Sequence, residues 1–288
     1  VDNCSQDNTV ELIEREYHWV RLIKSSNNDG FAAANNRGME ESEGEWIFFL
    51  NPDASVDMNS ILLLADHLRS ENSIGMVAPC IVDVDQQKTI SYFPFLDLST
   101  STWSAIGMQK LIPINKLNGK WIISRKPSNT IVEVERVIGA AMMVRSKVIE
   151  EVGGFDNRYF LFSEEEDLCY RMYNAGWKII YFPSVEVCHI GGTAMEKAKP
   201  ISIASANWSR YIFLKKYRSS LAAELSRMVW IITLIVRLIS VIILQNKSDK
   251  ANVLKGYSDS IKSLISPGYF DKCLRPKHTD KFESINTK

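Results

Sequence analysis

The sequence predicts an α/β protein in which helices flank a mostly parallel sheet. Short, continuous apolar runs such as 46–50 and 75–82 are typical of strands that are buried on both faces. Segments with helical spacing, such as 31–43 and 58–71, separate these runs, and alternating strands and helices indicate a layered α/β domain. The 288 residues are 45% hydrophobic and 24% charged, which suffices for a large core and excludes a disordered chain.

The other expected elements lie on either side of a central segment without a clear period. Before the first apolar run, we expect a helix over 5–20 and a short strand over 20–23. Residues 90–130 are interpreted as a loop-rich insertion. Beyond it we expect a strand within 132–144, a helix over 164–176, strands over 178–182 and 185–189, and a basic helical segment over 205–226.

The C-terminal part contains one long apolar segment, 228–244, interrupted near its middle by Arg237. A spanning helix needs about 20 apolar residues and disfavours a central arginine. Three interpretations therefore stay open: a helix lying in a membrane interface, a helix buried in the protein or facing another copy, and a true span. The polar, lysine-rich tail is expected to be loosely ordered. These features divide the chain into 1–200, 201–245 and 246–288.

Charge is unevenly distributed along a chain whose formal net charge is zero. Residues 201–288 hold 15 basic and 6 acidic side chains, which leaves 19 basic and 28 acidic side chains in the first 200. A strongly basic nucleic-acid binder is not expected from this balance, so no nucleic-acid partner is predicted. The acidic front can hold a cation, and the basic back can meet an anionic membrane surface or a phosphate. Five widely spaced cysteines without a CxxC pair favour a reducing cytosol.

Asn51-Pro52-Asp53 directly follows the apolar run at 46–50. Ligands of open α/β sheets bind beyond the carboxyl ends of the strands, and an Asp there can bind a divalent cation together with diphosphate oxygens. The simpler explanation is a turn that ends the strand, because Asn, Pro and Asp are all typical turn residues. Taken alone, this motif favours the turn.

Four acids stand in a row at Glu164-Glu165-Glu166-Asp167. Like charges this close repel one another, although acids at a helix N-terminus also suit the helix dipole. A carboxylate at a helix start can serve as general base for a sugar hydroxyl. The structural and the functional explanation can both hold here.

Two further motifs contain glycines that allow close approach of a ligand. His189-Ile190-Gly191-Gly192 closes an expected strand, where a lone His is more often structural than a ligand. Asn28-Asp29-Gly30 precedes a small-residue helix, a packing that lets backbone approach a nucleotide. The latter segment lacks both GxGxxG and GxxxxGK[ST] spacing, so dinucleotide and P-loop sites are not supported.

Taken together and in order, these segments resemble the family 2 glycosyltransferases, most closely their rhamnosyltransferase-like branch. The resemblance covers about residues 1–195, and its specificity comes from the order of the motifs, each of which is weak alone. The matching segments are 1–7, 28–38, 49–53, 139–144, 153–156, 160–171, 175–177 and 189–192.

The resemblance implies a GT-A fold, which is a Rossmann-like nucleotide-sugar domain, followed here by a C-terminal helical extension. Asp2 matches the acid that contacts the base or ribose of the donor. Asn28 and Gly30 belong to the same donor-binding segment, and Asn51 stands where the first acid of an Asp-x-Asp-type motif is found. Asp53 matches the metal ligand of that motif.

The metal implied by the resemblance is Mg2+ or Mn2+, and His189 matches a His that completes its site. Glu164-Glu165 occupies the place of a Glu-Asp pair whose second acid is the general base, so Glu165 is the expected base. Glutamate is one methylene longer than aspartate, and a misplacement on the order of 1 Å can cost about a hundredfold in rate. Glu164 or Asp167 can therefore share the role.

The implied activity is inverting transfer of a sugar from a nucleoside-diphosphate sugar, with rhamnose from dTDP-rhamnose as first expectation. The expected acceptor is a cell-surface glycan or a lipid-linked precursor, and the expected location is cytoplasmic, on the inner face of the cytoplasmic membrane through 228–244. The family begins with a strand and helix before Val1-Asp2-Asn3, which this chain is expected to lack. The alternative is a non-catalytic remnant or membrane-surface module that has lost donor binding. A nucleotidyltransferase is a weaker alternative, since no Gly-rich basic loop lies near the start.

Overall fold

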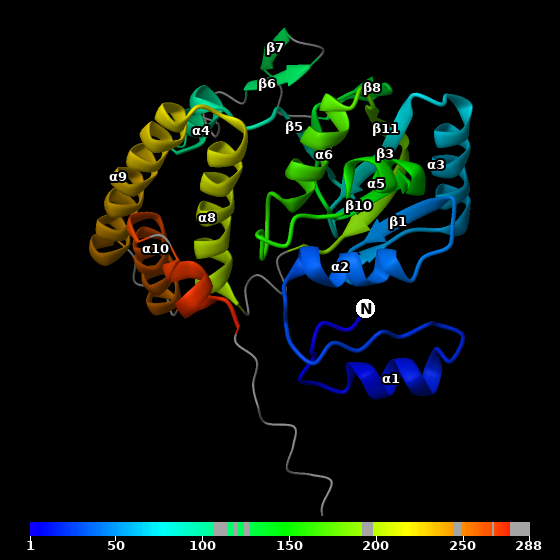
Figure 1. Cartoon of the computed structure of the whole chain (residues 1–288), viewed down its shortest axis with the longest axis horizontal. Helices are drawn as coiled ribbons and strands as arrows, with labels where there is room; N and C mark the ends of the chain where they lie inside the picture. Colours follow the sequence, from blue (N-terminus) through cyan, green and yellow to red (C-terminus); the bar gives the residue numbers. More distant parts are fainter. Residues whose placement is uncertain are drawn as a thin grey trace, which may run out of the picture.

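The computed structural model describes residues 1–105, 107, 114–117, 120–123, 127–191, 198–244, 249–266 and 268–276. It consists of an α/β part and a group of helices standing beside it (Figure 1). Gly192 of the expected His-Ile-Gly-Gly motif and the last residues of the tail, 277–288, lie outside the described residues.

The central sheet has the strand order β1-β10-β3-β11-β2. These strands are β1 (Trp46–Leu50), β10 (Ala141–Arg145), β3 (Ile74–Val82), β11 (Lys178–His189) and β2 (Ala54–Ser55). The expected strand at 46–50 is confirmed at both ends, and the expected strand at 75–82 begins one residue earlier. The α/β class is thereby confirmed.

The sheet is mixed, which corrects the expectation of a mostly parallel one. The strands β1, β3 and β11 run in the same direction, and β3 pairs with β11 in parallel. Between β1 and β3, however, β10 runs the opposite way, pairing Ile47 with Val144 on one side and Val144 with Met76 on the other. Because β10 is buried on both faces like β3, its apolar run contains no signal of direction.

One strand, β11, replaces the two expected over 178–182 and 185–189. Its pairing with β3 shifts register between Phe182 and Glu186. Pro183 lies within this shift, and proline cannot donate to a strand ladder, so the irregularity accommodates it. The strand then continues to His189, which lies opposite Ala54 of β2. This continuation brings the end of β11 beside the segment that follows β1.

Helices cover both faces of the sheet (Figure 1). Side chains of β3 alternate between the two cores. Val77 and Ile81 face Leu64 and Leu68 of one helix, α3 (Met58–Ser70), whose first turn is capped by the Asp57 carboxylate accepting from Ser60 N–H at 3.0 Å. The opposite core contains residues of α2 (Phe31–Glu40), α5 (Ser146–Val152) and α6 (Glu164–Asn174).

The N-terminal segment is attached to this body by loops. The helix expected over 5–20 is shorter, α1 (Thr9–Glu16), and it has no buried residue. The strand expected over 20–23 does not form. Instead, Asp2 and Lys24 make an isolated parallel bridge, with Asp2 N–H donating to Ile23 C=O at 2.8 Å.

The insertion expected to be loop-rich contains several short elements. Within 90–130 they are β5 (Tyr92–Phe93), α4 (Leu98–Ala105), β6 (Ile114–Leu117) and β7 (Lys120–Ile123). Short strands flank this range, with β4 (Lys88–Thr89) before it and β8 (Val132–Glu133) and β9 (Arg136–Val137) after it. β4 pairs with β3 and β8 with β11, so both extend the central sheet, whereas β5 and β9 form a separate pair. The strand expected within 132–144 is thus divided among β8, β9 and β10.

The C-terminal helices are α8 (Lys199–Tyr217), α9 (Ser220–Leu244), α10 (Lys250–Ile265) and a π-helical turn, η2 (Phe270–Leu274). The basic helix expected over 205–226 is therefore two helices, broken between α8 and α9, and the apolar segment 228–244 is the larger part of α9.

The expectation that the tail is loosely ordered is wrong for α10. Gly256 lies against Ile203 of α8, where a Cβ at that glycine would approach Ile203 Cδ1 to 2.8 Å. Ser260 is fully buried and accepts from Asn207 Nδ2–H at 3.2 Å. The buried face of α10 is made largely of small or polar residues, and its apolar side chains at helical spacing are Val253, Tyr257, Ile261 and Leu264.

Candidate active site

The motif after β1 and the end of β11 meet in one place. Asp53 Oδ1 lies 3.0 Å from His189 Nε2, and Asn51 Nδ2 lies 3.3 Å from the same nitrogen. Backbone bonds hold this arrangement, because Ile190 N–H donates to Asp53 C=O at 3.0 Å and Ala54 N–H donates to Asn51 C=O at 3.0 Å. All three expected residues are therefore brought together, although His189 is 136 positions from Asp53 in the sequence.

The donor set at this place fits a divalent cation. A carboxylate oxygen and an imidazole nitrogen are both metal ligands, and adjacent octahedral ligands at about 2.1 Å from an ion lie about 3.0 Å apart, as these two atoms do. Within the described part of the chain no group of three His, Cys, Asp or Glu side chains converges on such a point. Asp53 and His189 are therefore the two side chains that could hold a divalent cation here.

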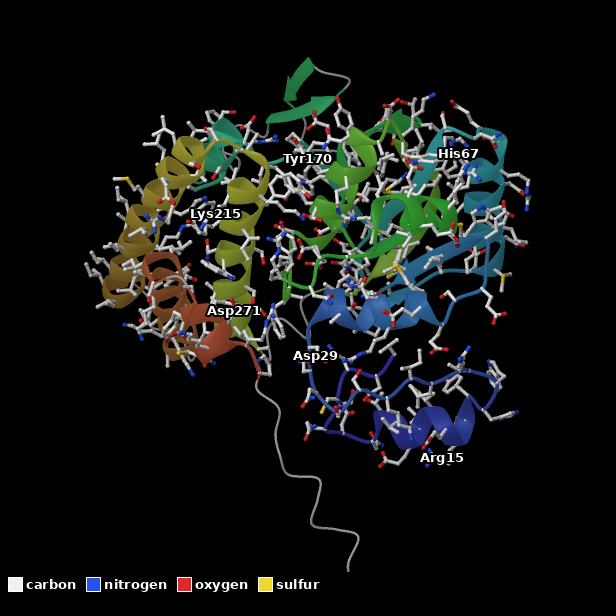
Figure 2. All side chains as sticks on the ribbon, in the orientation of Figure 1. Arg15, Asp29, His67, Tyr170, Lys215 and Asp271 are labelled. Atoms are coloured by element: carbon white, nitrogen blue, oxygen red, sulfur yellow. The ribbon has the colours of Figure 1, made fainter. Side chains whose placement is uncertain are left out.

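The N-terminal candidates form a second cluster around Asn3. Its side-chain amide donates to Asn28 Oδ1 at 2.9 Å and to Gly30 C=O at 3.1 Å, and its Oδ1 accepts from Asp29 N–H at 3.2 Å. Asp2 is buried and accepts from Ser5 N–H at 3.1 Å. Asn3 was not among the sequence candidates, yet these bonds tie the start of the chain to the loop of Asp29. Figure 2 labels Asp29 on this loop.

Gly30 joins this cluster to the acidic segment. Its φ is +90°, and a Cβ there would stand 2.2 Å from Phe160 C=O. The neighbouring Phe31 N–H donates to that same carbonyl at 2.9 Å. Both the conformation and the contact therefore require glycine. Two residues further along, Phe162 and Ser163 adopt left-handed φ values of 69° and 63°, which turn the chain into α6.

Glu164 and Glu165, in the first turn of α6, have buried carboxyl oxygens without partners. The described residues offer no hydrogen bond to Glu164 Oε2 or to Glu165 Oε2. Burial, and then the charge of Glu165, raises the pKa of Glu164 well above its usual range. Burial also raises the pKa of Glu165, against the opposing charge of Arg136. Unsatisfied buried carboxyls with raised pKa values are a feature of functional sites, because a purely structural role would not maintain them.

A short path connects this carboxyl pair to the Asp53-His189 pair. The Cα of Gly139 faces Glu165, since a Cβ placed on that glycine would stand 3.8 Å from Glu165 Cβ. The next residue, Ala140, accepts from Asn51 N–H at 2.9 Å. The candidate base and the candidate metal ligands therefore lie on either side of one turn, Gly139-Ala140.

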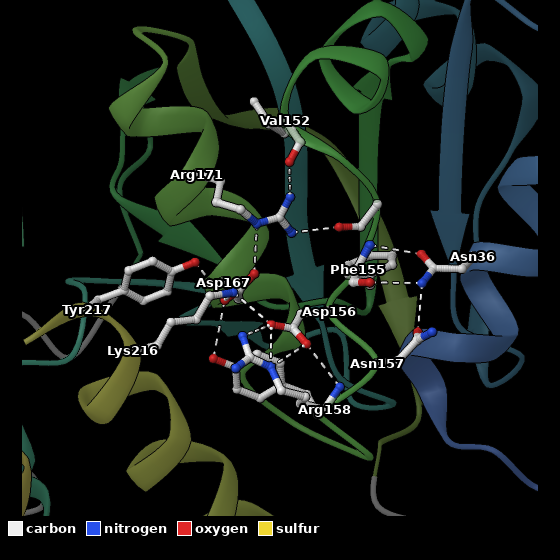
Figure 3. Close-up of polar contacts among 12 residues, drawn as sticks. Asn36, Val152, Phe155, Asp156, Asn157, Arg158, Asp167, Arg171, Lys216 and Tyr217 are labelled. Carbon is white, nitrogen blue, oxygen red and sulfur yellow. Dashed lines mark hydrogen bonds and ion pairs between the residues drawn. The ribbon is translucent and has the colours of Figure 1, made fainter.

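The other two acids of the run have partners that explain their burial. Glu166 Oε1 accepts from Leu96 N–H at 2.7 Å. Asp167 is fully buried and bonded on both oxygens (Figure 3): Oδ2 accepts from Arg171 Nε at 2.8 Å, and Oδ1 accepts from Lys216 Nζ at 2.6 Å and Tyr217 hydroxyl at 2.8 Å. Asp167, expected as a site acid, thus joins α6 to α8.

Two residues with influence on the site are not among the candidates from the sequence. Asn36 of α2 holds the 155–157 loop through a pair of bonds with the Phe155 backbone, at 2.8 Å and 2.9 Å, and a bond to Asn157 Oδ1 at 2.8 Å (Figure 3). Arg136 Nε of β9 lies 3.5 Å from Glu166 Oε1, and its positive charge opposes the rise that burial causes in the pKa of Glu165. Arg136 comes from a segment without any motif, whereas Asn36 lies in the matching segment 28–38, where no role was expected for it; only the packing places them.

Comparison with known proteins places these features in a family. The model of "Glycosyl transferase family 2" matches residues 1–127. The chain is 31% identical over 237 residues to the N-acetylglucosaminyl-diphospho-decaprenol L-rhamnosyltransferase of Mycobacterium tuberculosis, covering 74% of this chain and 72% of that protein. It is 26% identical over 152 residues to the rhamnosyltransferase WbbL of Escherichia coli, covering 51% of this chain and 53% of the relative.

Among solved structures, the mannosyltransferase PcManGT of Pyrobaculum calidifontis, in complex with GDP-Man and Mn2+, superposes with a TM-score of 0.52. The match covers 94% of this chain and 77% of that one at 13% sequence identity. A likeness at this identity concerns the fold, and it agrees with the α/β architecture and the helices beyond it.

Proposed function

Because this chain belongs to the family 2 glycosyltransferases, in their rhamnosyltransferase-like branch, we propose that it transfers rhamnose from dTDP-rhamnose to a lipid-linked or cell-surface glycan with inversion. One observation carries the proposal: Glu164 and Glu165 each have one buried carboxyl oxygen without a hydrogen-bond partner in the described residues, and they stand across one turn from the Asp53-His189 pair. The names of the two relatives support rhamnose as the sugar.

In the proposed mechanism, Glu165 is the general base. Its carboxylate takes the proton from an acceptor hydroxyl as that oxygen attacks the anomeric carbon, and the bond from this carbon to the donor diphosphate breaks on the opposite face. The raised pKa of Glu165 makes it a stronger base than an exposed glutamate. Burial, and then the charge of Glu165, raises the pKa of Glu164 beside it, which favours the proton on Glu164 when Glu165 is charged.

Asp53 and His189 would hold Mg2+ or Mn2+, with Asn51 beside them. When bound, such an ion neutralises charge on a leaving diphosphate. The residues around Asn3 position the donor: Asp2 would contact the base or ribose, and Asn28 and Gly30 would line the same pocket. Gly30 fixes the distance between this pocket and α6 through its contact with Phe160.

The proposal is tested by exchanging Glu165 for glutamine in the full 288-residue chain. We expect Glu165→Gln to lower turnover with dTDP-rhamnose and a lipid extract as acceptor by about 100-fold to 10,000-fold, since a positioned base contributes that much. Donor binding, followed by calorimetry, should stay within about twofold, because glutamine preserves the shape. UDP-glucose and UDP-galactose, assayed in parallel, test the choice of donor.

The matched control is Glu150→Gln, which removes one exposed carboxylate from α5. It should leave turnover unchanged. Full turnover of Glu165→Gln would refute the role of Glu165 as base. Absence of donor binding to the unaltered chain would instead favour the non-catalytic alternative.

Metal use is tested without an activity assay. Titration of Mn2+ followed by electron paramagnetic resonance should show one saturable site in the presence of dTDP. We expect Asp53→Asn and His189→Ala each to weaken Mn2+ binding by at least about tenfold, because each removes one of two protein ligands. Equal binding by all three proteins would contradict the assignment of this site.

A membrane-surface role is proposed for α9. Its 220–243 portion is long and apolar enough to cross a membrane, with a mean hydropathy of 2.0 and 22% of the residues of its most apolar window buried. One face, however, is packed: Ala223, Trp230 and Leu234 are buried against the other helices. The opposite face is an apolar stripe with exposures of 42–70%. It consists of Leu221, Leu225, Met228, Ile232, Ile235, Ile239 and Ile242.

A helix with one packed and one exposed apolar face suits the membrane interface better than a span surrounded by lipid. We expect the chain to float with vesicles of phosphatidylglycerol and phosphatidylethanolamine. Replacing Leu225, Ile232 and Ile239 with serine should weaken this binding by at least about 100-fold, since each loses the burial of a large aliphatic side chain. The control is serine at Leu62 and Leu63, exposed on α3. Equal flotation of both variants would refute the role of the stripe.

The same arrangement supports a cytoplasmic enzyme bound to the inner face of the membrane. The basic C-terminal part, with 15 basic against 6 acidic side chains, would lie toward anionic lipid. The site residues on β1, β11 and α6 would then lie next to a lipid-linked acceptor.

A further inference from the structure

Three arginines from different elements gather where the α/β part meets the C-terminal helices. Arg210 of α8 and Arg237 of α9 both lie over the ring of Trp230, with Cζ 5.0 Å and 6.0 Å from its centroid. The indole N–H of Trp230 donates to Ser101 Oγ of α4 at 2.9 Å, which fixes the ring. Arg136 of β9 is the third member, and its Nε donates to Pro94 C=O at 3.0 Å.

The three positive charges of this arginine cluster (Arg136, Arg210 and Arg237) outnumber the carboxylates that pair with them in the described residues. Arg136 lies 3.5 Å from Glu166 Oε1, at the edge of ion-pair contact. In the described ranges no Asp or Glu side chain comes within ion-pair distance of Arg210 or Arg237; Arg237 instead donates to Ala105 C=O at 2.9 Å. Burial, and then the charge of Arg136, lowers the pKa of Arg210 to about 10, while Glu166 opposes the shift.

Gathering like charges in a partly buried place costs free energy unless an anion compensates them. The carboxyls nearby compensate Arg136 rather than the whole cluster, because Glu166 Oε1 lies 3.5 Å from Arg136 Nε and no acidic side chain in the described ranges pairs with Arg210 or Arg237. Arginine also presents the planar, forked donors that suit phosphate oxygens. The cluster therefore fits an anionic ligand that comes from outside the chain.

The place of the cluster indicates which ligand. On one side, the charge of Arg136 reaches Glu165, the proposed base. On the other side, Arg237 belongs to α9, whose exposed apolar stripe faces away from the protein. A ligand held here would have its anionic group beside the reaction site and an apolar chain free to follow α9. Figure 1 shows α8 and α9 standing beside the α/β part, with α4 at one end between them.

We propose that Arg136, Arg210 and Arg237 bind the phosphate or diphosphate group of the lipid-linked acceptor. This inference rests on the proposed glycosyl transfer, and it adds a subsite that is separate from the Asp53-His189 donor site. The arginines hold the acceptor by its head group, so that the hydroxyl of the attached sugar reaches Glu165. Their role is to bind the acceptor rather than to take part in bond making.

The test measures binding in EDTA and without donor, so that its outcome does not depend on turnover. The probes are inorganic pyrophosphate and farnesyl diphosphate, titrated calorimetrically into the full chain. We expect saturable binding of farnesyl diphosphate that saturating dTDP does not displace. Tighter binding of farnesyl diphosphate than of pyrophosphate would identify a lipid-borne group, and equal binding would identify the phosphate alone as the recognised part.

Arg210→Gln and Arg237→Gln should each weaken binding at least about tenfold, since each removes one charge-assisted contact. Arg210→Lys keeps the charge and serves where the glutamine variant fails to fold; it should lose part of the affinity because it cannot form a fork. The matched control is Arg69→Gln, which removes an exposed arginine paired with Asp66 on α3. It should bind like the unaltered chain.

In turnover, the same variants should raise KM for the acceptor and leave KM for the donor unchanged. Unchanged binding by Arg210→Gln and Arg237→Gln would overturn the proposal, and so would displacement of the probe by dTDP. The proposal is supported if these variants lose probe binding while the unaltered chain binds the probe and transfers sugar. Normal probe binding by a chain that transfers no sugar would refute the glycosyl transfer and leave the anion site in place.

Discussion

Asp167 is the site candidate whose role the structure most sharply redefines, and Asp167→Asn is the substitution that tests it. The side chain is fully buried, and its oxygens accept from Arg171 Nε at 2.8 Å, Lys216 Nζ at 2.6 Å and Tyr217 hydroxyl at 2.8 Å (Figure 3). Asparagine has the same size but no charge, so the substitution isolates the electrostatic part of this network.

The magnitude follows from the two charged partners. A hydrogen bond to a charged group contributes about 1.5–3 kcal/mol, and two such bonds are weakened. Lys216 retains its ion pair with Asp156 at 2.7 Å, and Arg171 retains its hydrogen bonds to the Gly153 and Gly154 carbonyls at 2.9 Å and 2.7 Å. These contacts offset part of the loss. We therefore expect the free energy of unfolding to fall by about 3–5 kcal/mol, the range for breaking one partner of a buried ion pair.

The assay is urea unfolding of the full chain followed by far-ultraviolet circular dichroism, combined with turnover per folded molecule. Lys216→Met and the double variant complete a cycle, in which the coupling between Asp167 and Lys216 should exceed about 1 kcal/mol. Turnover of the folded fraction should remain within about tenfold. An unchanged unfolding midpoint with turnover lost as in Glu165→Gln would refute the structural role and return Asp167 to the reacting groups.

Three further predictions concern stability. Folding raises the pKa of Glu164, so its contribution to stability is complete below the unfolded value of about 4.3 and is lost as pH rises through the folded pKa. At about pH 8, Glu164→Gln should therefore have a free energy of unfolding about 1–3 kcal/mol higher than the parent, measured by urea unfolding. Near pH 4 the two proteins should not differ. Gly30→Ala should lower stability by about 1–3 kcal/mol and weaken dTDP binding, because its Cβ would clash with Phe160 C=O; an unaltered melting curve would contradict this. Burial opposes ionisation of Asp156, but bonds from Arg158 and Lys216 outweigh it and hold its pKa below the usual range. The stability from this group is therefore present above about pH 4 and is lost as pH falls below it. Asp156→Asn should have a lower free energy of unfolding than the parent at neutral pH, and the two should converge in acid.

Much of the α/β part could be predicted because its signals are local. The run Trp46–Leu50 is apolar without interruption, and the structure has a strand with the same ends. α3 begins after a capping Asp57 and shows helical spacing, so its start and end were predicted within a residue. The helix at Glu164 was predicted to begin where it does, because acids and a following apolar period mark a helix start.

The failures share one physical cause, which is that packing partners are distant in sequence. β10 runs opposite to its neighbours, and α10 packs its small buried residues on α8, and neither fact has a local signature. Arg136 is another case, since its segment carries no motif and its charge matters only beside Glu165.

The sequence alone determined the class of the protein and the identity of its chemical groups. The resemblance carried by the ordered motifs singled out Asp53, His189 and Glu165 as candidates, because these motifs are written directly in the chain. Only the tertiary structure decided which acids of the run keep an oxygen without a partner in the described residues, which acid joins α6 to α8, and where the arginines collect. A carboxylate's role depends on its burial and on the charges around it, and those come from segments up to 136 residues away, as between Asp53 and His189.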